Sequence, residues 1–91
     1  MKRPLYAIDV RNKMLNRWNE LEDEYPEEMR KLKAFLKQHP ANIRITNGKA
    51  KKLRGDLTGI YQYDVSYVDR VRYKIDKKNH VVKIVFAKGH P

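Results

Sequence analysis

The spacing of apolar side chains predicts a short strand and a helix in the first part of the chain. Residues 3–8 alternate loosely, which indicates an edge strand with Pro4 tolerated near its start. Asp9 is then expected to cap a helix running to about residue 24, because its carboxylate can accept the free amides of the first turn. This helix has one apolar stripe with spacings of four and three: Val10, Met14, Trp18, Leu21 and Tyr25.

A second helix is predicted to begin at Pro26. Tyr25-Pro26 ends the first helix, since the residue before proline avoids the α region, and Pro26 suits the first position of the next. An acidic pair in the first turn and Lys37 in the last favour the helix dipole. The buried stripe is expected to consist of Met29, Leu32, Phe35 and Leu36. The two helices should therefore pack as an antiparallel hairpin.

The last third of the chain alternates with a period of two, which is typical of strands. Strands are predicted over 59–67, 70–76 and 80–88, and residues 41–57 are expected to be irregular. In the third strand, Val82, Ile84 and Phe86 are expected on one face, with Val81, Lys83 and Val85 on the other. We predict one α+β domain over 1–91, in which an N-terminal short strand and two-helix hairpin pack on a three- to four-stranded antiparallel sheet.

Composition narrows the classes of function. The sequence has no run of eighteen apolar residues, so a membrane span is excluded, and no secretory leader is recognised. The absence of cysteine rules out disulfides and thiolate metal sites. Three histidines, at 39, 80 and 90, lack ligand-like spacing, so neither a metal nor a cofactor is expected. A cytoplasmic protein is the resulting expectation.

The charge balance points to a polyanionic partner. The formal net charge is +10, and it is uneven along the chain. Residues 1–40 carry nine basic and seven acidic side chains, whereas residues 41–91 carry twelve and four. Such a field attracts polyanions, so binding of nucleic acid or of an acidic protein is favoured over a merely soluble basic protein.

Two stretches of basic residues are candidate RNA contacts. One contains Lys49, Lys51, Lys52 and Arg54. The other is the polar side of the second predicted strand, where alternation puts Arg70, Arg72 and Lys74 in a row about 7 Å apart. Lys88 and His90 lie near the same surface if the last strand borders this one. The competing interpretation is an ordinary solvated face, since any half-buried sheet needs polar residues on its exposed side.

Cleavage of RNA would require three contributions from such a surface. A 2′-hydroxyl must lose its proton, the pentacoordinate phosphorane must be stabilised by positive charge, and the leaving oxygen must gain a proton. Arginine and lysine supply the charge. His90 is the proton-transfer candidate because its pKa is normally close to neutral.

Four segments between about residues 50 and 90 resemble the RelE/ParE superfamily of toxins from type II toxin–antitoxin systems. They are Lys52-Leu53-Arg54-Gly55, the run from Gly59 to Val65, the run from Asp69 to Asp76, and the run from Val82 to His90. The first half of the chain is similar to the family only in its strand–helix–helix order.

The resemblance implies a fold, an activity and partners. The family fold is a helical hairpin on an antiparallel sheet, and the implied activity is metal-independent mRNA cleavage, usually in the ribosomal A site. The implied partner is a cognate acidic antitoxin. By position, Arg70 matches the arginine of the family's second sheet motif, and Lys52 and Arg54 match basic residues before the sheet; the resemblance implies that these three catalytic candidates hold the phosphate. His90 stands where some members place a catalytic histidine.

Two other functions remain open at this point. The ParE branch of the superfamily shares the scaffold but acts on DNA gyrase without cleaving RNA. A basic, non-catalytic nucleic-acid-binding domain is the third hypothesis.

Overall fold

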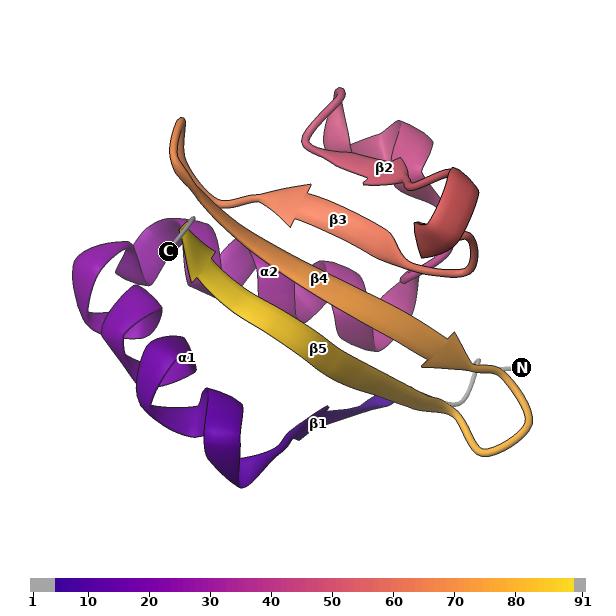
Figure 1. The fold of residues 1–91 in the computed structure, drawn as a ribbon, viewed down its shortest axis with the longest axis horizontal. Helices are drawn as coiled ribbons and strands as arrows, with labels where there is room; N and C mark the ends of the chain where they lie inside the picture. The colour runs from indigo at the N-terminus through magenta and orange to yellow at the C-terminus, as the bar shows by residue number, and fades with distance from the viewer. Residues whose placement is uncertain (1–4, 90–91) are drawn as a thin grey trace.

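The structure is a computed structural model that describes residues 5–89. Its elements, in chain order, are β1 (Ala7–Val10), α1 (Asn12–Glu24), α2 (Pro26–Gln38), the 3-10 turn η1 (Ile43–Thr46), β2 (Ala50–Lys52), the 3-10 turn η2 (Gly55–Leu57), β3 (Tyr61–Asp64), β4 (Asp69–Asp76) and β5 (Val81–Gly89). The strands form one sheet in the order β1-β5-β4-β3-β2 (Figure 1). The α+β prediction is therefore confirmed.

The sheet has five strands and is mixed, where three or four antiparallel strands were predicted. The meander of β3, β4 and β5 is antiparallel as expected, but β1 pairs with β5 in parallel. The additional strand is β2, which lies within the segment that was expected to be irregular. A three-residue strand is too short to show an alternating pattern, so its pairing with β3 reveals it only in the folded structure.

The start of the first helix also differs from the prediction. Asp9 belongs to β1, where it is the register partner of Lys83, and Arg11 occupies the N-cap position of α1 without a side-chain cap. The parallel pairing with β5 keeps the backbone extended through Val10, so the helix begins after the point at which Asp9 could cap it.

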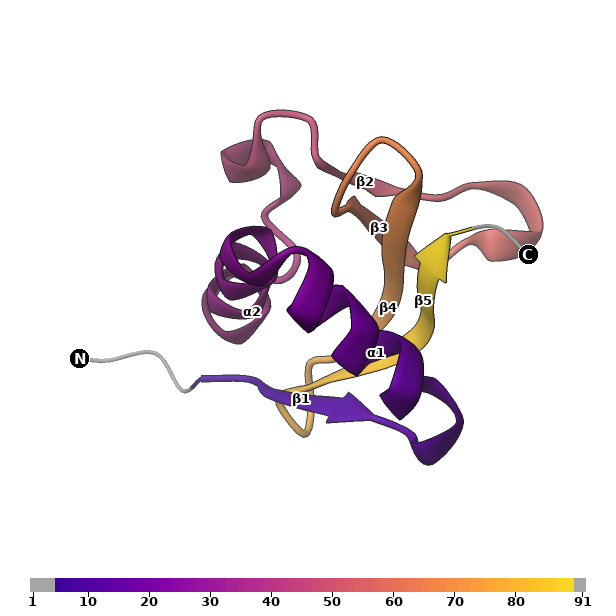
Figure 2. The ribbon, with the colours of Figure 1, turned by 90° about the vertical axis from the view of Figure 1, so that its left-hand side faces the viewer.

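Both helices lie on the same side of the sheet (Figure 2). The predicted stripe of α2 is confirmed, because all four of its residues are buried, and Trp18 and Leu21 of α1 join them in the core. Pro26 begins α2 as expected. An ion pair between Lys33 and Glu22 links the two helices. Neither helix of the described part is long and apolar enough to cross a membrane.

A β-bulge changes which side chains of β5 face the helices. Arg72 is paired with Phe86 and Tyr73 with Ile84, so Val85 is the extra residue on β5. An extra residue reverses the alternation beyond it. Ala87 is consequently buried, and Phe86 shares the opposite face with Arg72. The prediction that Phe86 faces the same way as Val82 and Ile84 is therefore wrong.

Candidate nucleic-acid interface

The sheet face opposite the helices, called here the open face, carries a line of side chains across four strands, and the members on β2, β3 and β4 are polar. The register places Lys51 of β2 beside Gln62 of β3, Gln62 beside Arg72 of β4, and Arg72 beside Phe86 of β5. The core residues Val71 and Tyr73 alternate with Arg70, Arg72 and Lys74 along β4. The predicted row of three cations on one side of this strand therefore exists.

Arg72 is held in place from two sides. Its Nε donates a hydrogen bond to Oε1 of Gln62 at 3.0 Å, and its guanidinium lies 5.5 Å from the ring centroid of Phe86. Gln62 is itself buried and is oriented by donating from Nε2 to Oδ1 of Asp64 at 3.0 Å. The terminal amino groups of Arg72 form no hydrogen bond within residues 5–89. They are thus positioned and available for an anionic ligand.

Arg70 lies one step along the same side of β4. Its register partners are Asp64 on β3 and Lys88 on β5. The Nε atom of Arg70 is buried and has no hydrogen-bond partner within the described part of the chain. A buried guanidinium N–H without an acceptor is costly, so an unpaired one in a polar surface calls for a ligand or an ordered water.

The adjacent lysines of β2 point to opposite faces of the sheet. Lys51 is exposed and is paired with Gln62 on the open face. Lys52 is paired with Tyr61, and its Nζ lies 5.7 Å from the centroid of that ring. Tyr61 in turn stacks on the buried Tyr73, with centroids 5.3 Å apart. Lys51 therefore lies on the same face as Arg72, with Gln62 between them, whereas Lys52 lies at the rim of the helix-covered face.

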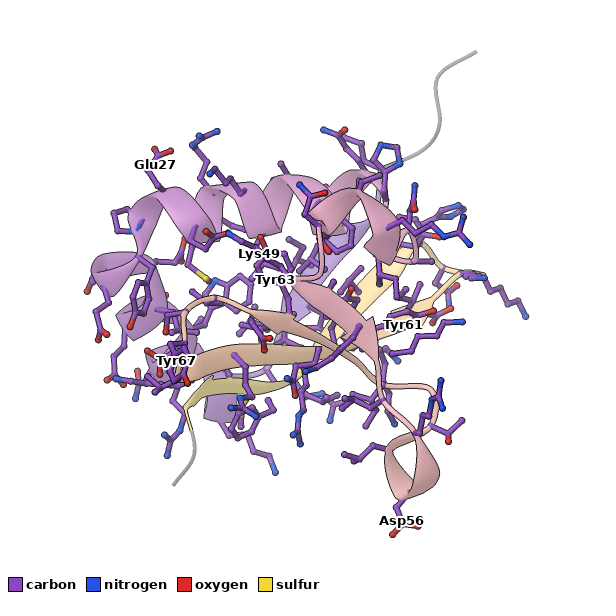
Figure 3. All side chains as sticks on the ribbon, turned by 90° about the horizontal axis from the view of Figure 1, so that it is seen from above. Glu27, Lys49, Asp56, Tyr61, Tyr63 and Tyr67 are labelled. Carbon is purple, nitrogen blue, oxygen red and sulfur yellow. The ribbon has the colours of Figure 1, made fainter. Side chains whose placement is uncertain are left out.

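Three other candidates are engaged elsewhere or stand apart. Lys49 donates to Oε1 of Glu28 on α2 at 2.5 Å, and it lies beside Tyr63 next to that helix (Figure 3). Lys88 donates to Oε2 of Glu20 on α1 at 2.6 Å, and this hydrogen bond raises the pKa of Lys88. Arg54 is exposed and occupies the N-cap position of the η2 turn, without a side-chain cap. This turn, marked by Asp56 in Figure 3, projects from the sheet.

His90 lies outside the described residues, so its predicted role in proton transfer stays a prediction. The described end of β5 can be placed: Gly89 is the register partner of Asp69, the residue before Arg70. The last two strands are thus neighbours, as the expectation for Lys88 and His90 required. Within residues 5–89 no group of three or more His, Asp or Glu side chains is arranged to hold a metal ion.

Sequence reasoning missed Gln62 and Phe86. Gln62 reads as an ordinary polar position of an alternating strand, and only its burial shows that it positions Arg72. Phe86 reads as a core residue until the bulge at Val85 is known. The sequence signal for Gln62 is weak, because it is an uncharged polar residue two positions before Asp64 in a stretch, 55–69, that has no Lys or Arg.

Comparison with known proteins gives structural likeness only, since no protein-family model and no curated sequence matches this chain. A structure of the archaeal RelE–RelB complex from Pyrococcus horikoshii aligns with a TM-score of 0.69 at 21% identity, covering 92% of this chain and 93% of that chain. A structure of the YoeB–YefM toxin–antitoxin complex from Staphylococcus aureus aligns with a TM-score of 0.65 at 21% identity, covering 94% and 98%.

A third structure, the YoeB/ParE toxin from Agrobacterium tumefaciens, aligns with a TM-score of 0.63 at 13% identity, covering 93% of this chain and 99% of that one. The alignments extend over the helical half as well as the sheet, whereas the motifs in the sequence covered only residues 50–90. The resemblance drawn from those motifs is thus confirmed at the level of structure: this chain has the fold of the RelE/ParE toxin superfamily.

Proposed function

We propose that this chain is the toxin of a type II toxin–antitoxin system and inhibits translation by cleaving mRNA on the ribosome without a metal. The observation that carries the proposal is the pair Arg70 and Arg72 on the open face. Arg70 has a buried nitrogen without a hydrogen-bond partner in the part of the chain that the structure describes, and Arg72 is held by Gln62 and Phe86. Two oriented guanidinium groups on adjacent positions of one strand face suit a phosphodiester.

The chemistry follows from what a phosphodiester needs. The 2′-oxygen attacks the neighbouring phosphorus after losing its proton to a base, and the bond from phosphorus to the 5′-oxygen breaks. The products are a cyclic phosphate and a 5′-hydroxyl. In this proposal Arg70 and Arg72 stabilise the charge that develops on the phosphorane. We assign protonation of the leaving oxygen to His90, and we assign stabilisation of the attacking 2′-oxygen to the positive charge of Lys51, which shares the open face with Arg72.

Lys52 and Arg54 keep a secondary place in the proposal. Both were assigned to phosphate binding by resemblance, but Lys52 rests on Tyr61 at the rim of the other face. They are assigned here to the RNA path before the sheet, outside the reacting centre. Lys74 continues the row along β4, while Lys49 and Lys88 are assigned a minor role because each already forms an ion pair with a glutamate.

A cognate antitoxin with an acidic toxin-binding segment is the proposed partner. The net charge of +10 favours such a segment. Two of the structures with this fold are toxin–antitoxin complexes, YoeB with YefM and RelE with RelB. An antitoxin that covers the open face would block Arg70 and Arg72 and thereby neutralise the toxin.

The test is cleavage of a reporter mRNA in a translating extract, mapped by primer extension. We expect discrete cuts with the wild-type chain and loss of these cuts with Arg70→Gln, Arg72→Gln and His90→Ala. Lys31→Gln, which removes one exposed positive charge from α2, is the matched control and should cleave like the wild type. Intact mRNA with the wild-type protein overturns the nuclease. Inhibition of gyrase supercoiling in the same preparation would then establish the ParE-like alternative.

A further inference from the structure

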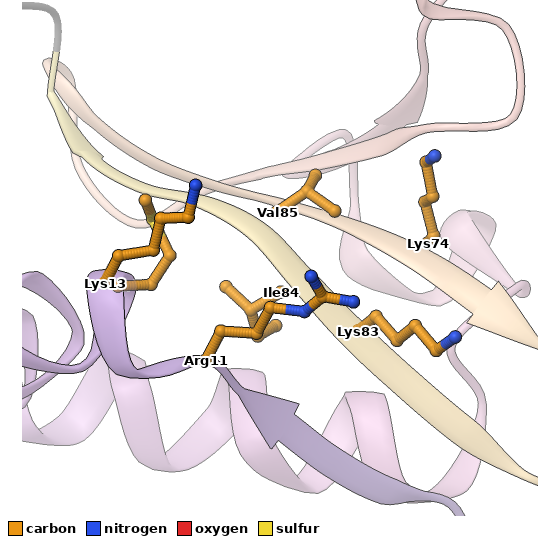
Figure 4. A pocket seen from close by; sticks show the side chains of 7 residues that line it. Arg11, Lys13, Lys74, Lys83, Ile84 and Val85 are labelled. Carbon is orange, nitrogen blue, oxygen red and sulfur yellow. The ribbon is translucent and has the colours of Figure 1, made fainter.

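A hollow of about 380 Å³ lies at the end of the sheet where β1 stops. Its lining, called here the basic hollow, consists of Arg11, Lys13, Met14, Lys74, Lys83, Ile84 and Val85. Figure 4 shows the side chain of Arg11 lying over β5 toward Lys83, with Lys13 and Lys74 farther out on either side. Four cations thus line one concave surface.

The hollow is a consequence of two features of the sheet. β1 ends at Val10, the register partner of Ile84, so no strand covers the edge of β5 beyond that point. The next residue of β5 is Val85, the bulged residue, which is partly exposed. The chain turns away at Arg11 into α1 and leaves an apolar floor with a basic rim.

The cations of the basic hollow have no ion-pair partner within residues 5–89. Two carboxylates are near Lys83, and neither forms an ion pair with it within the described residues: Asp9 is its register partner. The pKa of Asp76 is lowered by hydrogen bonds from Asn79 and, to a smaller extent, by the charge of Lys83. Positive charge therefore exceeds negative charge in the hollow, and like charges held together repel each other unless an anion lies between them.

The position of two of these cations opposes helix stability. Arg11 and Lys13 stand at the N-terminus of α1, whose first turn contains no acidic residue. The positive end of a helix dipole favours acidic side chains there, so this arrangement weakens the helix. A local conflict of this kind is expected where a site binds an anion.

We infer that the basic hollow binds backbone phosphate of the RNA strand beyond the point at which Arg70 and Arg72 hold it. Lys74 belongs to both surfaces: it is the third cation of the row on β4 and the register partner of Lys83. Residues two apart on a strand are separated by about 7 Å, and paired residues by about 5 Å. The cations consequently form a continuous path from Arg70 to the hollow, and the apolar floor suits the ribose and base that accompany a phosphate.

This inference rests on the proposed RNA-binding function, and its test separates the two. The probes are single-stranded 2′-O-methyl oligoribonucleotides of increasing length, which lack the attacking hydroxyl, and their affinity is measured at several salt concentrations. The variant is Arg11→Gln with Lys83→Gln. The control is Lys31→Gln with Arg44→Gln, which removes the same charge from exposed positions outside the hollow. Thermal unfolding checks that both variants fold.

We expect the hollow variant to bind short oligomers like the wild type and to lose about tenfold in affinity for long ones. The slope of log affinity against log salt should fall by about 0.7 for each phosphate that the variant no longer neutralises. If the hollow variant and its control lose the same affinity for long oligomers, the hollow has no specific role and the inference is overturned, while RNA binding by the rest of the surface still stands. A second outcome would also overturn the inference. If the hollow variant loses as much affinity for a polyglutamate peptide as for RNA, and the loss for RNA does not depend on oligomer length, the hollow binds an acidic protein. Failure of the wild type to bind any oligomer overturns the inference, whereas the proposed function is decided separately by cleavage of mRNA in the translating extract.

Discussion

Arg72 on β4 and Gln62 on β3 face each other across two antiparallel strands and share a hydrogen bond of 3.0 Å between Nε and Oε1. Gln62 is 3% exposed, so this hydrogen bond positions a cation from within the sheet. The same guanidinium rests on Phe86 from the opposite strand. The orientation of Arg72 thus depends on a buried amide and on an aromatic ring of the neighbouring strand.

A double-mutant cycle measures this interaction. Gln62→Leu, Arg72→Met and the double variant should show a coupling energy of about 1–2 kcal/mol in urea unfolding, because either substitution alone already removes the buried hydrogen bond to a charged group. RNA affinity should fall in Gln62→Leu even though Arg72 is intact. A coupling near zero would mean that Gln62 does not position Arg72.

Lys51 and Lys52 form a matched pair for the open face. Both substitutions to Gln remove one positive charge from neighbouring positions, but only Lys51 lies on the same face as Arg72. Lys51→Gln should lower the salt slope of single-stranded RNA binding by about 0.7, whereas Lys52→Gln should change it less. A larger decrease of the salt slope in Lys52→Gln than in Lys51→Gln would show that Lys52, and not Lys51, contacts the RNA.

The hydroxyl of Tyr25 joins the helical hairpin to the start of β4. It donates to Oδ2 of Asp69 at 2.7 Å, and Asp69 is buried next to Arg70. Tyr25→Phe should cost about 1–3 kcal/mol, because the buried carboxylate is deprived of a donor. Tyr67→Phe removes a hydroxyl from a fully exposed ring and should leave the free energy of unfolding unchanged. Chemical denaturation of the two variants compares them directly.

Trp18 anchors α1 in the core with 5% of its surface exposed. Trp18→Ala should destabilise the protein by about 3–5 kcal/mol through reduced burial and the cavity that remains. Leu15→Ala, on the exposed side of the same helix, should change stability by less than about 0.5 kcal/mol. Unchanged thermal stability of Trp18→Ala would show that the helix packs through another face.

Glu28 makes stability depend on pH. Burial opposes ionisation of its carboxyl, but hydrogen bonds from Lys49 and Tyr63 outweigh that effect, so the pKa of Glu28 is lowered from 4.5 in the folded state. A lowered folded pKa gives stability that is present above the unfolded pKa and is lost as the pH falls through the folded value.

We therefore expect Glu28→Gln to be less stable than the wild type at neutral pH. The gap should narrow in urea unfolding as the pH falls below about 4.5. Glu27 and Asp76 also have lowered pKa values, but both residues are present in the wild type and in Glu28→Gln. The difference in the free energy of unfolding between these two proteins therefore reports on Glu28 alone. A gap that stays constant down to about pH 3 would contradict this account.

The sequence by itself determined the elements whose patterns are long and local. The helical stripes, the break at Tyr25-Pro26 and the alternation of Arg70, Arg72 and Lys74 with core residues all follow from periodicities of about 3.6 and 2. The four motifs between residues 50 and 90 were enough to indicate the superfamily fold. These features depend only on neighbours along the chain, which is why they are readable without a structure.

Only the tertiary structure decided how the cations are shared between faces and partners. The pairing of β1 with β5 took Asp9 into a strand, and the bulge at Val85 turned Phe86 toward Arg72. Pairing with β3 separated Lys51 from Lys52. The basic hollow gathers Arg11 and Lys83 from segments far apart in the chain. Register, bulges and contacts between distant segments are set by competition among pairings of the whole sheet, and no local pattern encodes the outcome.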